Sequence, residues 1–331
     1  MQVVIDNAIP YIHGVLEPYC EVIYLPAKQI TASIVHSANA LIIRTRTKCD
    51  KALLDGSAVK FIATATIGTD HIDIEYCAEH GIEVHSAPGC NARGVLQWVA
   101  ATLHHITTLD NCSPDHYTLG VVGVGNVGSL VSKYARYWGF KVMECDPPRQ
   151  QREGGEFYSI HEIAQSCDII TLHTPLNGTT YHMIDKELIS SMHSNTTIIN
   201  ASRGEIVDNR AITASGHRYI FDVWENEPNI DHKVLHGATL STPHIAGYSI
   251  QGKANATAMV IRALAQYFNL PLKEWYPEKI ERTTPQLISW EELCVTIPEF
   301  YDIKKESLLL KNSPQDFELM RNSYDYRNEY F

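Results

Sequence analysis

The sequence contains no apolar run close to the roughly 18 residues that a membrane-spanning helix needs, and it does not begin with a signal-peptide pattern. No C-x-x-C pair occurs among its eight cysteines, so we expect neither disulfides nor a metal site. Basic residues are not in excess, because 27 Lys and Arg face 38 Asp and Glu, a formal net charge of −11. These absences disfavour a nucleic-acid or membrane partner and predict a protein of the reducing cytosol.

The chain is long enough for two domains, because it has 331 residues and a typical domain has about 150. Hydrophobic residues make up 44% of it and charged residues 20%, as in globular proteins that bury a core. It contains no internal repeat and no low-complexity tract. We therefore expect an ordered globular protein over most of the length.

Residues 1–90 alternate short apolar runs with helical patterns. This alternation predicts parallel strands whose sheet is covered by helices on both faces. Two helical stretches are Lys48–Leu54 and His71–His80, and Gly81 after the second is a typical C-terminal cap. The predicted strands are Val3–Ile5, Val22–Leu25, Ala40–Ile43, Val59–Ala63 and Ile82–Val84.

A second α/β series lies between two long helical patterns, at about residues 91–109 and 251–268. In the first of these, Val95, Val99 and Leu103 recur at helical spacing. We interpret the series as a nucleotide-binding domain that is inserted into the first domain, with the two long helices as hinges. Its predicted strands are Thr118–Val122, Lys141–Glu144, Ile169–Leu172, Thr197–Asn200, Tyr219–Val223 and Ala238–Ser241.

These patterns divide the chain into three parts. The first domain consists of residues 1–92 and 249–270, the inserted domain of residues 93–248, and a C-terminal segment of residues 271–331. That segment is too short for a strong core of its own. Its apolar side chains must therefore cover the parent domain or a second subunit.

The strongest local motif is G-x-G-x-x-G, formed by Gly123, Gly125 and Gly128 between an apolar strand and a helix. The first glycine permits a tight turn, the second lets the backbone approach a pyrophosphate, and the third lets helix and strand pack closely. The N–H groups at the start of the helix favour a phosphate there. Asp146 ends the next strand, where a carboxylate accepts hydrogen bonds from ribose hydroxyls and repels a 2′-phosphate. NAD is favoured over NADP, although the nearby Arg149 leaves NADP open.

Three further side chains follow three successive strands on the predicted cofactor side. They are Arg203, Glu227 and His244. A guanidinium can hold a carboxylate, an imidazole can exchange the proton of a hydroxyl group, and a carboxylate can orient that imidazole. Each residue alone has an ordinary structural explanation, such as a surface ion pair or a core histidine. Their joint position after a dinucleotide motif favours hydride transfer to or from a hydroxy acid.

The order GVGNVG (123–128), NASRGEIVDN (200–209), DVWENEP (222–228) and HIAGY (244–248) resembles the D-isomer-specific 2-hydroxyacid dehydrogenase family. The resemblance extends over nearly the whole chain. It implies an α/β fold in which a flavodoxin-like substrate domain is split around an inserted Rossmann domain, followed by a short C-terminal dimerisation segment. It also implies NAD as the cofactor and Arg203, Glu227 and His244 as the catalytic set.

Other motifs point to one branch of the family, whose substrate is a small phosphorylated hydroxy acid. They are IRTRTK (43–48), TATIGTDHID (64–73), APGCNA (87–92) and CDPPR (145–149). The resemblance implies that Thr45, Thr66 and Tyr248 contact the substrate. The glycine motif and the acid that follows it predict cofactor contacts at Gly123, Gly125, Asn126, Val127, Gly128 and Asp146. The resemblance implies further cofactor contacts at Thr174, Ser202, Asp222 and Gly247.

Arg44 and Arg46 are the further candidates for holding the substrate. If residues 44–46 are extended, the two guanidinium groups share one face, because alternate side chains of an extended segment point the same way. Such a pair could hold a phosphate or a carboxylate. A solvated charged loop is the alternative that composition alone leaves open.

Rival functions remain at this point. The chain could be a dehydrogenase of another D-2-hydroxy acid such as 3-phosphoglycerate, a non-catalytic NAD-sensing protein, or a scaffold whose tail recruits a partner. The complete Arg/Glu/His set argues against a pure sensor, which needs no proton carrier. Twofold homodimers are the commonest closed assembly, and with the apolar C-terminal segment they predict a homodimer.

Overall fold

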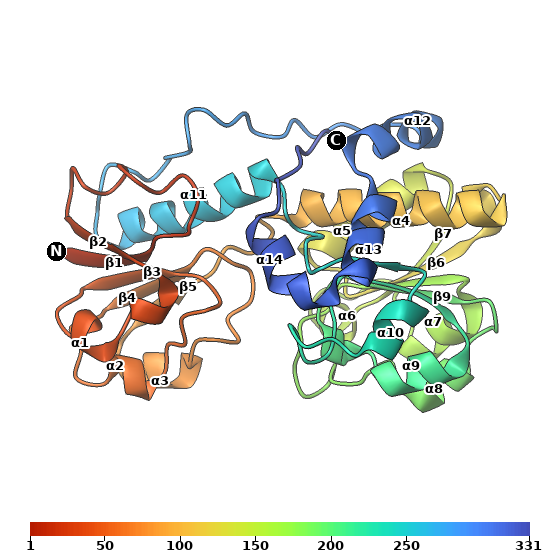
Figure 1. The fold of residues 1–331 in the computed structure, drawn as a ribbon, viewed down its shortest axis with the longest axis horizontal. Coiled ribbons are helices and arrows are strands. Elements are labelled where there is room, and N and C mark those ends of the chain that lie inside the picture. Colours follow the sequence, from red (N-terminus) through yellow and green to blue (C-terminus); the bar gives the residue numbers. More distant parts are fainter. The chain divides into compact units, whose positions relative to one another are not determined.

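A computed structural model describes residues 1–331, and the chain divides into two compact units (Figure 1). The first unit comprises residues 1–91 and 250–282, and the second comprises residues 92–249 and 283–331. The second unit is thus inserted into the first unit, and the last part of the chain, residues 283–331, returns to the second unit.

The first unit is built on a five-stranded parallel sheet with the order β2-β1-β3-β4-β5. This is the order of flavodoxin-like folds, and it confirms the fold expected of this part. All five predicted strands form, each within two residues of its expected ends. They are β1 (Gln2–Asp6), β2 (Glu21–Leu25), β3 (Ala40–Ile43), β4 (Phe61–Thr64) and β5 (Glu83–His85).

Both faces of this sheet are covered by helices. Alternate residues of its central strands point to opposite faces, and both sets are therefore buried. Val4 belongs to one apolar cluster, and Val3 and Ile5 belong to another. The long helix α11 (Ile250–Tyr267) supplies Val260 and Leu264 to the second cluster and is drawn in cyan in Figure 1. The other helices are η1 (Ala27–Gln29), α1 (Ala32–Val35), α2 (Lys51–Leu54) and α3 (Ile74–Glu79).

The second unit contains a six-stranded parallel sheet with the order β11-β10-β9-β8-β6-β7. The strand order reverses between β6 and β8, which is the switch point where open α/β sheets bind ligands. The strands are β6 (Thr118–Val122), β7 (Lys141–Cys145), β8 (Ile169–Leu172), β9 (Thr197–Asn200), β10 (Arg218–Phe221) and β11 (Leu240–Ser241). Strand β11 is shorter than predicted because Ala238 caps the preceding helix.

Short helices connect these strands, and the long helix α4 (Ala92–Asp110) precedes them. Trp98, Val99 and Leu103 of α4 are buried in the main core of the second unit, as the helical spacing of apolar residues predicts. The remaining helices of this part are η2 (Pro114–His116), α5 (Asn126–Tyr137), α6 (Pro147–Glu153), α7 (Ile160–Ser166), α8 (Lys186–Ser190), η3 (Gly204–Ile206), α9 (Asn209–Ser215) and α10 (His232–Gly237).

The C-terminal segment is not a separate third piece, which corrects the boundary expected at residue 271. Residues 271–282 belong to the first unit and residues 283–331 to the second. The reason is packing: Leu293, Ile297 and Phe331 lie in the main core of the second unit. This last part forms α12 (Trp290–Phe300), α13 (Ile303–Asn312), η4 (Pro314–Asp316) and α14 (Phe317–Asn322), drawn in blue in Figure 1.

Three general findings bear on function. No helix has the length and apolar character that crossing a membrane requires. No group of three or more His, Cys, Asp or Glu side chains is arranged to hold a metal ion. All eight cysteines are free thiols.

Candidate active site

The carboxyl ends of the six parallel strands of the second unit lie at one edge of its sheet, where an open α/β sheet binds its ligand. The predicted catalytic and cofactor residues of this unit all follow such strand ends. The glycine loop follows β6, Asp146 follows β7, Thr174 follows β8, Arg203 follows β9, Glu227 follows β10 and His244 follows β11. The predicted catalytic and cofactor residues are more than a hundred residues apart in the sequence, and the fold places them at the same edge of the sheet.

The three glycines of the loop after β6 have different structural roles. Gly123 has a φ of +85°, and a Cβ atom there would lie 2.8 Å from the carbonyl group of His173. At Gly128 a Cβ atom would lie 1.9 Å from the carbonyl oxygen of Gly123, so helix and strand pack too closely for any side chain. Nothing lies within 4 Å of a Cβ position at Gly125. Packing within the protein thus requires glycine at positions 123 and 128, whereas the space beside Gly125 is open for a ligand.

Thr174 adds a second sign of a ligand beside this loop. Its Oγ1 is buried and has no hydrogen-bond partner within the chain, and its methyl group is next to Gly123. Buried polar groups are rarely left unpaired. A dinucleotide whose pyrophosphate lies at the start of α5 fits both the open space at Gly125 and the unpaired hydroxyl group of Thr174.

Asp146 holds the glycine loop in place. Its Oδ2 accepts a hydrogen bond from the N–H of Val124 at 2.8 Å, and its Oδ1 accepts one from the N–H of Arg149 at 2.9 Å. Arg149 in turn donates from Nη1 to the carbonyl oxygen of Val124 at 2.8 Å and from Nε to Glu153 at 2.8 Å. The role of Asp146 toward a ribose stays a prediction, and the structure adds a positioning role that the sequence did not indicate.

The turn that carries Arg203 is organised by Asn200, the last residue of β9. Oδ1 of Asn200 accepts hydrogen bonds from the N–H and hydroxyl groups of Ser202, at 3.0 and 2.9 Å, and its Nδ2 donates to the carbonyl oxygen of Arg203 at 2.8 Å. A Cβ atom at Gly204 would lie 2.0 Å from the carbonyl carbon of Trp224. The Arg203 turn is therefore packed directly against the loop that leads to Glu227.

His244 and Glu227 form a hydrogen-bonded pair. Nδ1 of His244 lies 2.7 Å from Oε2 of Glu227, and Oε1 of Glu227 accepts the N–H of Trp224 at 2.9 Å. His244 has a φ of +57°, which is uncommon for a residue other than glycine and is typical of functional sites. The imidazole side chain is 32% exposed, so the ring stays accessible to a ligand. This is the arrangement of a general acid–base histidine with its orienting carboxylate.

Glu227 is held in its charged form. Burial raises the pKa of this carboxyl group, but the charge and hydrogen bond of His244, the charge of Arg321 and the N–H of Trp224 together outweigh burial. The pKa of Glu227 is therefore below its usual range. A charged carboxylate at this position stabilises a positive charge on the imidazole ring.

Asp222 organises the loop that carries His244, and its own contacts are within the protein. The side chain is buried. Its Oδ1 accepts from the hydroxyl of Thr242 at 2.6 Å and from the N–H of Ile245 at 2.8 Å, and its Oδ2 accepts from the N–H of Ala246 at 2.9 Å. The cofactor contact expected of Asp222 stays a prediction, whereas its role in shaping the histidine loop is visible in these bonds.

Two arginines of the C-terminal segment reach this site, and the sequence analysis missed both. Nη1 of Arg321 in α14 lies 3.9 Å from Oε2 of Glu227. Arg327 donates from Nη1 to the carbonyl oxygen of Ile245 at 3.1 Å and from Nη2 to that of Ala246. No motif marks these residues, because only the tertiary fold brings the segment against the histidine loop.

Gly247 and Tyr248 follow the loop that carries His244. Gly247 lies near α4, and Tyr248 lies near the C-terminal segment. The carbonyl group of Gly247 lies within 3.4 Å of a Cβ position at Gly94 in α4. The ring of Tyr248 lies near two tail tyrosines, with centroids 6.0 Å from Tyr324 and 5.9 Å from Tyr326. The ring of Tyr248 thus lies against the C-terminal segment. The contact of Tyr248 with the substrate stays a prediction.

The first unit contains the other predicted substrate residues, and here one expectation is wrong. Residues 44–47 form a turn, with the N–H of Thr47 bonded to the carbonyl oxygen of Arg44 at 3.2 Å, so the alternation of an extended segment does not apply. Arg44 forms a two-pronged pair with the buried carboxylate of Asp6, its Nε 3.0 Å from Oδ2 and its Nη2 3.4 Å from Oδ1. Arg44 is therefore anchored in the unit, whereas Thr45 and Arg46 are exposed at the tip of the turn.

Thr66 belongs to a hydroxyl network at the end of β4. Its Oγ1 lies 2.7 Å from Oγ1 of Thr64 and donates to the carbonyl oxygen of Gly68 at 3.3 Å. Nε2 of His71 lies 3.2 Å from Oγ1 of Thr64, and burial lowers the pKa of His71. A neutral imidazole and two hydroxyl groups can bind a polar ligand without adding charge.

Comparison with known proteins identifies the family. Residues 97–246 match the NAD-binding domain of the D-isomer specific 2-hydroxyacid dehydrogenases. The erythronate-4-phosphate dehydrogenase of Bacteroides fragilis strain YCH46 is 45% identical, and the match covers 99% of this chain and 97% of that protein. The protein of the same name from Pseudomonas putida strain W619 is 36% identical over 99% of this chain and 93% of that protein. This chain belongs to the D-isomer-specific 2-hydroxyacid dehydrogenase family.

Solved structures share the fold of this chain. The D-lactate dehydrogenase of Aquifex aeolicus, complexed with NAD and lactic acid, matches with a TM-score of 0.68 at 24% identity over 82% of this chain and 97% of that chain. The NAD-bound 3-phosphoglycerate dehydrogenase of Entamoeba histolytica matches with a TM-score of 0.68 at 27% identity over 85% of this chain and 99% of that chain. The predicted family, α/β fold and NAD cofactor are confirmed.

Proposed function

We propose that this D-2-hydroxyacid dehydrogenase oxidises 4-phospho-D-erythronate to (R)-3-hydroxy-2-oxo-4-phosphooxybutanoate with NAD, a step of pyridoxal 5′-phosphate biosynthesis. The contact of 2.7 Å between Nδ1 of His244 and Oε2 of Glu227 carries the proposal, because it is a proton carrier with its orienting carboxylate. The names of the relatives from Bacteroides fragilis and Pseudomonas putida support this substrate.

The chain's own residues supply acid–base chemistry and positioning. The glycine loop at Gly123, Gly125 and Gly128 would hold NAD, which would supply the acceptor for the hydride that leaves C2 of the substrate. The accessible nitrogen of His244 takes the proton of the C2 hydroxyl group, and the charged Glu227 stabilises the imidazolium that results. Asp222 keeps the histidine loop in the conformation in which this proton transfer occurs.

Arg203 is the residue that holds the substrate carboxylate in this proposal. Its guanidinium group can bind a carboxylate through two hydrogen bonds and polarise the C2 oxygen, on which negative charge develops as the proton leaves. The Asn200-centred turn keeps the backbone of Arg203 in place before substrate arrives. Such preorganisation lowers the barrier, because the group does not have to reorient during the reaction.

The phosphate of the substrate is assigned to the basic turn of the first unit. Arg46 and Thr45 are exposed at its tip, and Arg44 is held by the buried Asp6. Arg46 is the main phosphate ligand in this proposal because it is exposed at the tip of the turn and a guanidinium group matches the oxygens of a phosphate. Arg44 anchors that turn to Asp6.

The experiment is substitution of the proton carrier. His244→Ala should keep NAD affinity, measured by calorimetry, and lower turnover of 4-phospho-D-erythronate by roughly two to four orders of magnitude, the range for a lost general acid–base group. His232→Ala is the matched control, because His232 begins α10 and is exposed. Near-normal turnover by His244→Ala would remove the proposed role, and absence of turnover by the wild type on any D-2-hydroxy acid would favour an NAD-sensing protein.

The proposal also includes a homodimer in the cytoplasm. Leu308 and Leu319 of the C-terminal segment are 61% and 62% exposed, and Val295 is 72% exposed. Exposed apolar side chains of this size are typical of interaction surfaces, and a second copy of the chain is the commonest occupant of such a surface. The free cysteines are compatible with a reducing compartment.

A further inference from the structure

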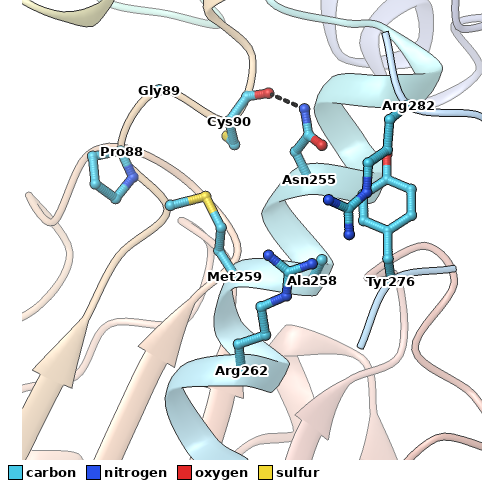
Figure 2. Close-up of a pocket in the computed structure, with 9 residues that line it drawn as sticks. All are labelled: Pro88, Gly89, Cys90, Asn255, Ala258, Met259, Arg262, Tyr276 and Arg282. Carbon is cyan, nitrogen blue, oxygen red and sulfur yellow. Dashed lines mark hydrogen bonds between the residues drawn. The ribbon is translucent and has the colours of Figure 1, made fainter. Parts of the chain in front are cut away.

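A second candidate binding site lies entirely within the first unit. Figure 2 shows a cavity of 230 Å³ that is lined by the loop Pro88–Cys90, by one face of α11 and by the chain that follows this helix. Helix α11 supplies Asn255, Arg262 and two apolar residues between them, at positions i, i+3, i+4 and i+7 of one helix face. The residues of the proposed active site do not line this cavity.

Two guanidinium groups face this cavity, as Figure 2 shows for Arg262 and Arg282. Nε of Arg262 donates to the carbonyl oxygen of Trp275 at 2.8 Å, and the guanidinium carbon of Arg282 lies 4.4 Å from the ring centroid of Tyr276. Neither arginine forms an ion pair with a carboxylate, and no Asp or Glu lines the cavity. The cavity therefore contains two positive charges without a negative one.

The walls of the cavity are fixed by contacts within the chain. Nδ2 of Asn255 donates to the carbonyl oxygen of Cys90 at 3.0 Å, which ties the loop to α11 and is the dashed line in Figure 2. The bond from Arg262 to Trp275 ties the following segment to the same helix. These bonds leave further N–H groups of both guanidinium groups for a ligand. Two like charges in one cavity repel each other, and a bound anion converts this repulsion into attraction.

We propose that this cavity binds a small dianion, carrying phosphate or carboxylate groups, between Arg262 and Arg282. Arginine is suited to this role because its planar fork matches the oxygens of both groups. The volume of 230 Å³ suits a phosphomonoester or a dicarboxylate of a few carbons.

The cavity is lined by segments that are next to the connections between the two units along the chain. The chain passes between the two units after residues 91, 249 and 282. Cys90 precedes the first passage, Asn255 follows the second, and Arg282 is the last residue before the third. An anion that bridges Arg262 and Arg282 would fasten these three segments to one another within the first unit.

The test is calorimetric titration of inorganic phosphate, and separately of malonate, into the full-length protein saturated with NAD. Arg262→Gln/Arg282→Gln should bind the preferred anion about a hundredfold more weakly or not at all, because each of the two lost charged hydrogen bonds weakens binding roughly tenfold. Lys60→Gln is the matched control, since Lys60 is an exposed cation elsewhere in the first unit. Binding that the double variant loses reports on this cavity: loss for phosphate identifies a phosphomonoester site, loss for malonate a dicarboxylate site, and loss for both a site that accepts either group.

The single variant Arg282→Gln controls for misfolding of the double variant, because Arg282 is exposed and makes no hydrogen bond that stabilises the fold. It should also weaken anion binding about tenfold while the unfolding midpoint in urea stays unchanged. If the wild type binds neither anion, or if both arginine variants bind it with wild-type affinity and stoichiometry, the proposal is wrong. The readout is binding, so this result is independent of whether 4-phospho-D-erythronate is the substrate.

Discussion

Arg321 in the C-terminal helix α14 places Nη1 3.9 Å from Oε2 of Glu227, the oxygen that also contacts Nδ1 of His244 at 2.7 Å. The side chain of Arg321 is 20% exposed, and that of Glu227 is 19% exposed. The carboxylate thus interacts with an imidazole and a guanidinium group at once. The positive charge of Arg321 helps to hold the pKa of Glu227 below its usual range.

The first prediction concerns this charge. Oxidation needs a charged Glu227, so kcat/KM rises with pH as this carboxyl group loses its proton. Removing the charge in Arg321→Met makes the proton harder to remove, and the acid limb of the profile should move up by roughly one pH unit. Arg321→Lys should restore most of the wild-type profile. A profile that is unchanged in Arg321→Met would contradict an electrostatic role and leave only a packing role.

The second prediction concerns Asp222, whose two oxygens accept three hydrogen bonds from the histidine loop. Asp222→Asn replaces an acceptor oxygen by an NH₂ group that faces a donor, so the unfolding free energy should fall by about 2 kcal/mol. Turnover should fall as well, because the loop that carries His244 loses its support. Urea unfolding and steady-state kinetics measure both effects.

Asp168→Asn is the matched control for this change. Oδ2 of Asp168 accepts the N–H of Thr118 at 2.8 Å, where β6 and β8 begin, at the opposite edge of the sheet from the proposed site. This variant should retain wild-type turnover. Equal loss of turnover in both variants would mean that Asp222 acts only through general stability.

The third prediction separates two glycines of one motif. Gly125→Ala adds a Cβ atom to open space, so stability should stay the same while NAD affinity falls about tenfold or more, because the pyrophosphate approaches there. Gly128→Ala places a Cβ atom 1.9 Å from the carbonyl oxygen of Gly123, so the unfolding free energy should fall by about 2 kcal/mol. Urea unfolding and calorimetry with NAD measure the two effects. Unchanged NAD affinity in Gly125→Ala would place the pyrophosphate elsewhere.

The fourth prediction concerns the dimer. Removing the C-terminal segment is not a clean test, because Leu293 and Ile297 belong to the main core of the second unit. Leu308→Asp/Leu319→Asp instead changes two exposed side chains and should give a folded monomer in sedimentation velocity. Leu310→Asp is the contrasting variant, since Leu310 is fully buried and this change should unfold the protein. A double variant that sediments like a dimeric wild type would show that this surface does not hold the subunits together.

The parts of the site that could be predicted from the sequence are those encoded locally. The glycine loop, the turn of Arg203 and the positions of Glu227 and His244 each follow one strand within a few residues, and parallel strands must end at one edge. Strand and helix order follow from apolar periodicity for the same reason. No long-range contact is needed for any of these predictions.

The parts that could not be predicted depend on contacts between distant segments. Arg321 and Arg327 lie in a segment of mixed charge, and nothing in that pattern marks which cations are buried against the histidine loop. The conformation of the turn at Arg44 could not be predicted, because the guanidinium group of Arg44 pairs with Asp6 at the end of another strand. The division of the C-terminal segment at residue 282 likewise depends on which core its apolar side chains enter.

The measurement that tests the central claim most directly is a single-turnover reaction of the full-length enzyme with NAD, followed by the absorbance of NADH. The substrates to compare are 4-phospho-D-erythronate, D-erythronate, 3-phosphoglycerate and D-lactate. The account predicts that 4-phospho-D-erythronate is oxidised with at least about a hundredfold higher kcat/KM than D-erythronate, because charged hydrogen bonds to the phosphate contribute about 3 kcal/mol. NADH formation that is equally fast with D-erythronate, or fastest with D-lactate or 3-phosphoglycerate, would contradict it.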